Sequence, residues 1–254
     1  MNQESIKKAA EAIKNARYGI AFTGAGISVE SGVPPFRGSA NSVWAKYDPQ
    51  LLDIDYFYAH PAESWKAINE IFLNFMFKHE IHPNTAHYAL AEYERLGYVK
   101  CVITQNIDIL HQQAGSRNVY EYHGTAGRIR CTKCDFTTTP DKIDLAALPP
   151  KCPKCGALLK PDFIFFGEGI PAEAYQGSAS AAMQADVCIV VGTTGEVMPA
   201  GMIPITVKRH GGTIIEVNPT HSAFTDSVTD IYLDGKAGEV FEALNKELGV
   251  TISK

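Results

Sequence analysis

The chain has 254 residues, of which 45% are hydrophobic and 20% are charged, and its formal net charge is -5. This is the composition of a globular protein that is long enough for one large domain with insertions. The negative balance gives no overall basic field, so nucleic acid is not an expected partner. No apolar stretch reaches the ~18 residues of a membrane span, and the first residues lack the pattern of a secretory signal. We therefore expect a cytoplasmic monomer that binds neither membranes nor specific nucleic acid.

The chain opens with a helix and a strand. Apolar residues at helical spacing predict a first helix over residues 5–16. The apolar run 18–23 predicts a buried strand that leads into the glycine-rich segment 24–38. A strand that runs into a glycine-rich turn can bring backbone N–H groups close to a phosphate. Gly24 and Gly26 do not complete the GxGxxG pattern of dehydrogenases, so this turn alone is a weak signal.

The end of the glycine-rich segment has an unusual composition. Pro34 and Pro35 stiffen the chain, and a large aromatic residue, Phe36, then stands beside a fixed cation, Arg37. A loop that only held a pyrophosphate would not need these residues. We interpret the segment as a loop that also covers the reactive end of a cofactor.

Further along, helices and strands alternate. The predicted helical regions are 44–77, with breaks at Pro49 and Pro61, then 87–96 and 238–248. The predicted strands are 98–104, 186–191, 213–217 and 231–233. Alternation of this kind indicates an α/β fold with a parallel, doubly wound sheet.

Small and polar residues follow several of the predicted strands. They form the segments 24–28, 105–108 and 192–194, together with Asn218. Ligands of open α/β sheets bind outside the carboxyl ends of the strands. The four positions should therefore converge on one binding crevice.

Four of the six cysteines form two CxxC pairs that are separated by 17 residues. This spacing is typical of a four-cysteine zinc ribbon. Four thiolates fill a tetrahedral shell, whereas a catalytic zinc keeps an open position, so a structural ion is favoured. Cys101 and Cys188 lie in apolar runs and are interpreted as small buried hydrophobic residues.

These motifs occur together in the order found in one protein family. The segments GAGISVESGVPPFRG, TQNIDILHQQAG, HGT and FFGE, with the paired cysteines between the last two, resemble those of sirtuins of prokaryotic type, and the likeness extends from about residue 16 to 240. Sirtuins are NAD-dependent protein lysine deacylases. The resemblance implies a Rossmann-type NAD-binding domain (1–36, 86–125 and 160–254) and a smaller domain. The smaller domain would combine a helical module (37–85) with a zinc module (126–159), and an acyl-lysine protein or peptide would bind between the two domains.

The resemblance also implies roles for individual residues. His123 would be the general base that accepts a proton from a ribose hydroxyl of NAD, which suits an imidazole with a pKa of about 6.5. Asn106 would be the second catalytic residue, and Asp108 would accept hydrogen bonds from the nicotinamide carboxamide. The implied NAD-binding residues are Gly24, Ala25, Gly26, Ser28, Val29, Phe36, Arg37, Gln105, Asn106, Ile107, Asp108, Thr193, Thr194, Asn218, Lys236 and Ala237. The implied peptide-binding strand is Ile164, Phe165, Phe166 and Gly167, and the implied zinc ligands are Cys131, Cys134, Cys152 and Cys155.

Departures from the family pattern concern the cofactor loop and the acyl site. Pro35, Val29 and the pair Gly195 and Glu196 differ from the usual residues. Sirtuins that prefer acidic acyl groups carry a Tyr and an Arg three residues apart in the helical module, and residues 65–77 contain neither. A buried succinyl carboxylate would lack its partner, so neutral acyl groups are predicted.

Three other classes of protein share parts of this pattern. A mono-ADP-ribosyltransferase could use the same site, because both reactions begin by breaking the nicotinamide glycosidic bond. A redox enzyme is disfavoured because GxGxxG is absent, and His123 and Asn106 argue against a non-catalytic NAD-binding module.

Alternatives also remain for single features. His111 is interpreted as helix surface or a hydrogen-bond partner rather than a catalytic residue, and Asp108 could also cap a helix. The apolar run 71–77 is expected to pack within the small domain rather than to line an acyl channel. Basic residues around the cysteines are expected to form a solvated face rather than a docking surface. They are Arg128, Arg130, Lys133, Lys151 and Lys154.

Overall fold

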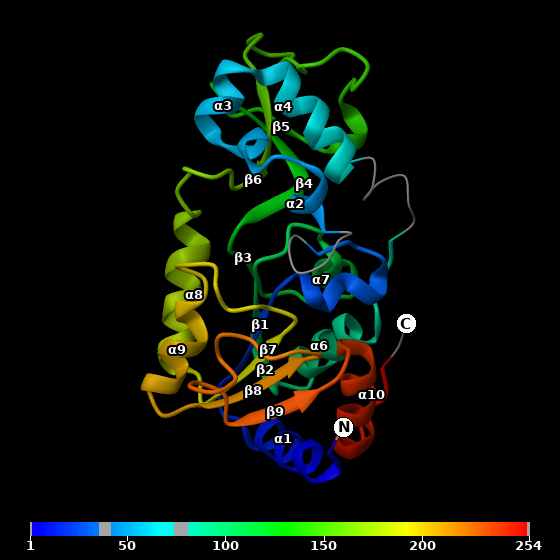
Figure 1. Cartoon of the computed structure of the whole chain (residues 1–254), viewed down its shortest axis with the longest axis vertical. Helices are drawn as coiled ribbons and strands as arrows, with labels where there is room; N and C mark the ends of the chain where they lie inside the picture. Colours follow the sequence, from blue (N-terminus) through cyan, green and yellow to red (C-terminus); the bar gives the residue numbers. More distant parts are fainter. Residues whose placement is uncertain (1, 36–41, 74–80, 253–254) are drawn as a thin grey trace.

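The computed structural model of the chain describes residues 2–35, 42–73 and 81–252. A larger lobe is built around one sheet, and a smaller lobe lies above it in Figure 1. Among the described helices, none combines the length and the apolar character needed to cross a membrane.

The larger lobe contains a six-stranded parallel sheet in the order β3-β2-β1-β7-β8-β9. Its strands are β1 (Gly19–Thr23), β2 (Val99–Thr104), β3 (Val119–Glu121), β7 (Val187–Val191), β8 (Thr213–Asn218) and β9 (Ile231–Asp234). From β1 the chain builds outward to β3 on one side and later to β9 on the other. The order therefore reverses between β1 and β7, where doubly wound folds bind their ligands. The predicted parallel sheet is confirmed.

Helices cover both faces of this sheet because its central strands are apolar on both sides. Ala21 and Val102 face a core that includes α1 (Gln3–Asn15), α6 (Thr85–Arg95) and α10 (Ala237–Leu248). Ile20 and Phe22 face the opposite core, formed with α8 (Ala172–Gln184) and α9 (Met202–Arg209). The result is a three-layer sandwich whose carboxyl edge points toward the smaller lobe (Figure 1).

The smaller lobe joins an antiparallel sheet to a group of short helices. The sheet has the order β5-β4-β6, with β4 (Gly124–Cys131), β5 (Thr137–Thr138) and β6 (Leu159–Phe163), and η4 (Pro140–Lys142) follows β5. The helices are α2 (Val43–Lys46), η2 (Pro49–Leu52), α3 (Ile54–Ala59), α4 (Pro61–Ile68) and the π-helical turn η3 (Asn69–Leu73). The buried Trp65 links the two parts by donating its Nε1–H to Leu159 O at 2.8 Å.

The structure refines several of the predicted elements. Residues 71–73 are buried in the core of the smaller lobe, as expected, while 74–77 lie outside the described residues. The helices α8 and α9 were not anticipated, and α8 gives a weak signal because it is rich in Ala, Ser and Gly. The small sheet begins at Gly124 and ends at Phe163, slightly outside the limits expected for the zinc module. The division of the chain into domains stays a prediction.

Candidate active site

Two glycine turns meet at the carboxyl edge of the large sheet, between β1 and β7. Gly24 donates its N–H to Val191 O at 2.9 Å, and Gly26 donates to Gly192 O at 2.8 Å. A Cβ on Gly26 would lie 2.5 Å from Gly192 Cα, which no real side chain tolerates. The glycines therefore allow the two turns to touch, and these two N–H groups hold the turns together instead of pointing at a phosphate. After Gly24 the chain forms a 3₁₀-helix, η1 (Ala25–Ser31).

Asn106, Ser28 and Asp108 form a buried polar cluster beside these turns. Ser28 Oγ donates to Asp108 Oδ2 at 2.6 Å and accepts from Asn106 Nδ2 at 3.2 Å. Asn106 Nδ2 also donates to Gly24 O at 3.1 Å. Because a carbonyl only accepts, these contacts fix the amide orientation and leave Oδ1 as the atom that a ligand can meet. Burial raises the pKa of Asp108, against the opposing effect of the Ser28 hydrogen bond.

Two buried histidines support this cluster. His111 Nε2 lies 3.0 Å from Thr23 Oγ1, which donates to Thr104 Oγ1 at 2.9 Å, and Thr104 Oγ1 in turn accepts the N–H of Asn106. Burial lowers the pKa of His111 to about 3, so the ring is neutral. The expectation that His111 lies on a helix surface is wrong, because the side chain is buried. The alternative, that His111 is a hydrogen-bond partner, is confirmed by its contact with Thr23.

His87 on α6 was not singled out from the sequence. Its ring lies 4.9 Å from that of His111, and its Nε2 is 3.4 Å from Ser28 Oγ. Its Nδ1 accepts the N–H of Asn84 at 3.3 Å, so the ring proton is on Nε2. Burial holds the pKa of His87 well below its usual value. The ring is therefore a neutral donor to Ser28.

The backbone after Asp108 is strained. Ile109 has φ 61°, the only positive φ of a non-glycine residue in the described part of the chain, and β-branched residues rarely adopt it. Ile109, rather than Asp108, is the N-cap of α7 (Leu110–Gln113). Asp108 Oδ1 nevertheless accepts the N–H of Leu110 at 3.0 Å, so the carboxylate assists the start of the helix.

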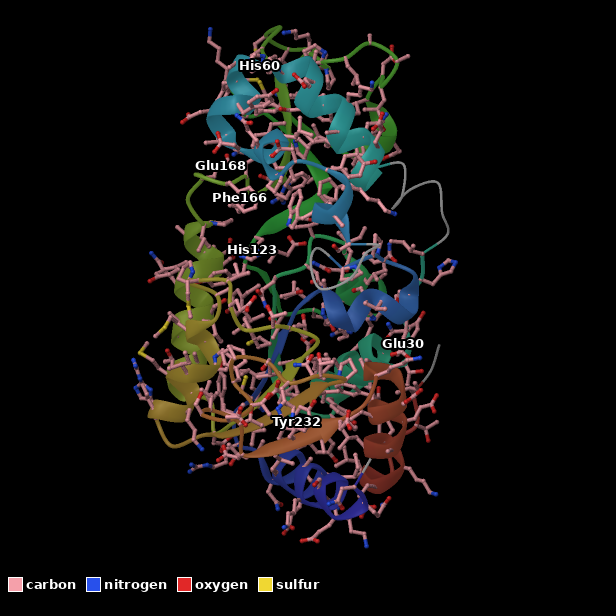
Figure 2. The ribbon with its side chains drawn as sticks, viewed as in Figure 1. Glu30, His60, His123, Phe166, Glu168 and Tyr232 are labelled. Atoms are coloured by element: carbon pink, nitrogen blue, oxygen red, sulfur yellow. The ribbon has the colours of Figure 1, made fainter. Side chains whose placement is uncertain are left out.

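His123 follows β3 and stands between the two lobes (Figure 2). Its Nδ1 lies 3.1 Å from Gln105 O, and because that carbonyl only accepts, the ring proton is on Nδ1. Nε2 is thus the basic nitrogen. Burial lowers the pKa of His123, partly offset by the Gln105 carbonyl, so the imidazole is neutral at pH 7.

Asn218 marks the other end of the site, at the end of β8. Its Nδ2 donates to Thr193 O at 3.1 Å and to Glu216 Oε1 at 2.9 Å. As at Asn106, both amide protons are used within the chain and Oδ1 is left for a ligand. Gln105 Nε2 donates to Thr193 Oγ1 at 3.0 Å, so residues after β2, β7 and β8 meet, as the sequence predicted.

The remaining candidates lie around this edge. Ile107 is buried, Val29 and Thr194 are exposed, and Lys236 and Ala237 begin α10. Phe36 and Arg37 lie outside the described residues. Ile164 to Gly167 follow β6 outside any strand, and the N–H of Glu168 donates back to Phe165 O at 3.0 Å, as in a turn. Ile164 N–H donates to His123 O at 2.8 Å, and Phe166 is 46% exposed.

The sulfur atoms of Cys131, Cys134, Cys152 and Cys155 lie within 4.8 Å of one another. The Sγ of Cys131 also accepts the N–H groups of Lys133 and Cys134, at 3.3 and 3.4 Å, as thiolates in metal knuckles do. Four converging thiolates fit a structural zinc ion. Cys101 and Cys188 are buried in the large sheet, as predicted.

The basic residues around the cysteines are partly paired. Arg128 and Arg130 contact Asp162, and Lys154 contacts Asp135 at 3.2 Å. Arg128, Arg130 and Lys154 remain exposed, which agrees with a solvated face.

Fold and site together define a nucleotide-binding enzyme with a Rossmann-type sheet and a separate four-thiolate metal module. The Sir2 family model matches residues 24–199. The chain is 44% identical over 253 residues to an NAD-dependent protein deacylase of Pyrococcus abyssi, covering 96% of this chain and 98% of the relative. A relative of the same name from Pyrococcus furiosus is 46% identical over 90% and 92% of the two chains. The chain belongs to the Sir2 family.

Solved structures agree with this assignment. A Sir2 structure with a deacetylated p53 peptide and 3'-O-acetyl ADP-ribose matches with a TM-score of 0.90 at 33% identity, covering 97% of this chain and 99% of that chain. A complex of a Sir2 homolog with NAD matches with a TM-score of 0.87 at 41% identity, covering 96% and 93%.

Proposed function

We propose that this chain is an NAD-dependent protein lysine deacylase. The observation that carries the proposal is the hydrogen-bond polarity of the site. Asn106 Oδ1, Asp108, His123 Nε2 and Asn218 Oδ1 are all acceptors. NAD offers matching donors in its ribose hydroxyls and its carboxamide. The relatives that match most of the chain are named deacylases or deacetylases, so transfer of ADP-ribose to protein is not favoured.

When bound, NAD supplies a ribose carbon that accepts the acyl oxygen as nicotinamide leaves. In this proposal Asp108 and Asn106 hold the nicotinamide end, and Asn218 holds the adenosine end. Nε2 of His123 takes the proton from a ribose hydroxyl, because its other nitrogen is fixed by Gln105 O. With water, the overall products are nicotinamide, free lysine and O-acyl-ADP-ribose.

The substrate class follows from the surroundings of Ile164–Gly167. We propose that an acyl-lysine peptide lies along this segment. The segment lies next to His123, because the N–H of Ile164 donates a hydrogen bond to the His123 carbonyl. Neutral acyl groups are expected, since residues 65–77 carry no Tyr or Arg. We also expect the protein to be cytoplasmic and monomeric, without specific nucleic-acid partners.

The decisive measurement is NAD-dependent release of nicotinamide from acetyl, butyryl, myristoyl and succinyl versions of one lysine peptide. We expect turnover that requires peptide and NAD, with little activity on the succinyl peptide. His123→Ala should lower kcat about 10²–10⁴-fold, the usual contribution of a general base. Peptide-dependent turnover that survives this substitution would overturn the mechanism, and labelled ADP-ribose retained on protein would indicate the transferase instead.

A further inference from the structure

Lys160 is a lysine buried inside the smaller lobe. Only 1% of its surface is exposed, yet its Nζ makes three hydrogen bonds: to Phe163 O at 2.8 Å, to Pro161 O at 3.0 Å and to Glu168 Oε2 at 2.8 Å. The ammonium also lies 4.1 Å from the ring centroid of Phe165. Because an ammonium has three protons, all of its donors are satisfied.

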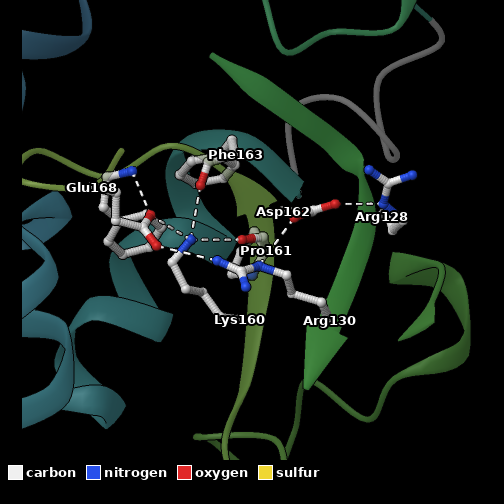
Figure 3. A network of polar contacts seen from close by, with 8 residues as sticks. Arg128, Arg130, Lys160, Pro161, Asp162, Phe163 and Glu168 are labelled. Atoms are coloured by element: carbon white, nitrogen blue, oxygen red, sulfur yellow. Dashed lines mark hydrogen bonds and ion pairs between the residues drawn. The ribbon is translucent and has the colours of Figure 1, made fainter. Parts of the chain in front are cut away.

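The acceptors all belong to the chain that immediately follows Lys160. This chain curls around the ammonium, as Figure 3 shows. Glu168 closes the curl, since its Oε2 also accepts the N–H of Phe165 at 2.8 Å and its own N–H donates to Phe165 O at 3.0 Å. Residues 164–167 are therefore tied at both ends to one buried charge.

Backbone hydrogen bonds also tie the same segment to His123 and to two short helices of the smaller lobe. Ile164 N–H donates to His123 O, and Phe166 exchanges backbone hydrogen bonds with Leu52 and Ile54. In Figure 2 Phe166 and Glu168 lie on the small-lobe side of His123. The buried ammonium thus fixes the backbone of a segment that is exposed at Phe166 and Gly167 and that is hydrogen-bonded to the proposed general base through Ile164.

Further charges brace Glu168 and the start of the curl. Arg130 contacts Glu168 Oε1 at 3.2 Å and Asp162 Oδ1 at 3.0 Å, and Arg128 also contacts Asp162. Such a network is not needed to stabilise a fold, because well-packed apolar residues in place of all the charged partners often stabilise it as much or more. What the ion pair adds is a defined geometry for the segment that it holds.

We propose that Lys160 is a positioning residue for the peptide substrate: its ammonium, through Glu168 and the carbonyls of Pro161 and Phe163, sets the conformation of residues 164–167. This inference rests on the proposed deacylase function. It assigns to Lys160 no contact with NAD or with the reacting atoms.

Peptide binding should also weaken at the pH at which Lys160 loses its proton. Burial lowers the pKa of Lys160 to about 8, and Glu168 and Asp162 oppose this shift while Arg130 adds to it. Carboxylates and guanidinium groups keep their charge between pH 7 and 10. Loss of the Lys160 proton should therefore release the curl, and the peptide KM should rise as the pH passes about 8.

The test compares Lys160→Met, which keeps the length of the side chain and removes the charge, with the wild-type enzyme. We expect the peptide KM to rise about 10-fold or more, one charge-assisted hydrogen bond being worth about that factor. The KM for NAD and the kcat at saturating peptide should change less than about 3-fold, and the pH dependence of the peptide KM near pH 8 should disappear. The melting temperature should fall, because Glu168 and the carbonyls of Pro161 and Phe163 lose their buried donor. Lys142→Met, at an exposed lysine of the same lobe, is the matched control.

An unchanged peptide KM, or KM values for peptide and NAD that rise by the same factor, would overturn the inference. If Lys160→Met does not fold, the wild-type pH profile decides, measured with a peptide that has no group titrating between pH 7 and 9. A flat peptide KM across that range would then overturn it. Absence of nicotinamide release by the wild-type enzyme would refute the proposed function itself, which separates the two failures.

Discussion

Two carboxylates are buried at the two ends of the site, and their surroundings differ. Glu216 is 0% exposed, and four side chains donate hydrogen bonds to it. These donors are Asn218, Ser222, Thr225 and Thr229. Asp108 is 5% exposed and accepts from Ser28 Oγ and from the N–H of Leu110. Burial alone therefore does not distinguish the two groups.

The difference lies in how much acceptor capacity each carboxylate has left. A carboxylate has about four lone-pair positions, and the chain fills those of Glu216 with its own donors. Glu216 thereby holds the loop from Asn218 to Thr229 and orients the Asn218 amide. Asp108 keeps capacity for a ligand, and its raised pKa records an unfavourable burial, as is common at functional sites. The comparison gives Glu216 a structural role and is consistent with the binding role proposed for Asp108.

The largest effect should come from Glu216→Ala. A buried donor left without an acceptor costs about 1–3 kcal/mol, which applies to Asn218, and the partly buried hydroxyls of Ser222, Thr225 and Thr229 add smaller losses. Because several donors lose their partner together, the unfolding free energy should fall by at least about 3 kcal/mol, measured by urea denaturation. Glu216→Gln, which keeps the shape and one acceptor oxygen, should lose less.

Glu173→Gln, at an exposed position of α8, serves as the control and should change stability by less than about 0.5 kcal/mol. If Glu216→Ala were as stable as this control, the loop after β8 would not depend on Glu216. The contrast between the two carboxylates would then be lost.

A smaller effect, on activity instead of stability, is expected from Asp108→Asn. Loss of a charged acceptor for the carboxamide should lower kcat/KM for NAD about 10- to 100-fold, since such hydrogen bonds are worth about 1.5–3 kcal/mol. The variant should lose less stability than Glu216→Ala, because the amide keeps one of the two acceptor oxygens that Ser28 and Leu110 use. Steady-state kinetics and denaturation on the same preparation check both statements. A variant that loses stability and keeps its kcat/KM would reverse the assigned roles.

The smallest effect concerns pH. The difference in unfolding free energy between Asp108→Asn and the wild type should change with pH. The folded-state pKa of Asp108 lies above its ordinary value of 3.8 because of burial. Its contribution to stability is therefore complete below about pH 3.8 and is lost as the pH rises through the folded-state pKa. An Asn side chain does not titrate. The stability of the variant relative to the wild type should therefore increase as the pH increases from 4 to 7. Parallel stability curves across this range would show that Asp108 is not unfavourably buried.

Much of the large lobe follows from local patterns. The apolar runs of β1, β2, β7 and β8 predict buried parallel strands, and the polar residues after them predict a shared edge. The strand β3 has three residues and α8 has few large apolar ones, so neither gives a clear periodic signal. The predicted convergence of the four polar segments is confirmed, because Gln105 and Asn218 both contact Thr193, and Asn106 contacts Gly24.

The supporting residues of the site were harder to predict. Lys160 alternates with apolar neighbours as an exposed lysine on a half-buried strand would, and only the curl to Glu168 reveals its burial. Glu216 gave a usable signal, a carboxylate within the apolar run of β8. His87 occupies one position of an ordinary amphipathic helix, and nothing local marks it as a partner of Ser28.

The sequence by itself determined the main strands of the large sheet and the four-thiolate cluster, and it supplied the proposed catalytic and binding residues, because each depends on residue types at short, regular spacing. The tertiary structure alone decided the direction of the hydrogen bonds. Which nitrogen of His123 is basic, which atoms of Asn106 and Asn218 remain for a ligand, and which buried carboxylate has capacity to spare all depend on partners distant in the chain. Hydrogen-bond polarity is a property of contacts, and contacts exist only once the chain has folded.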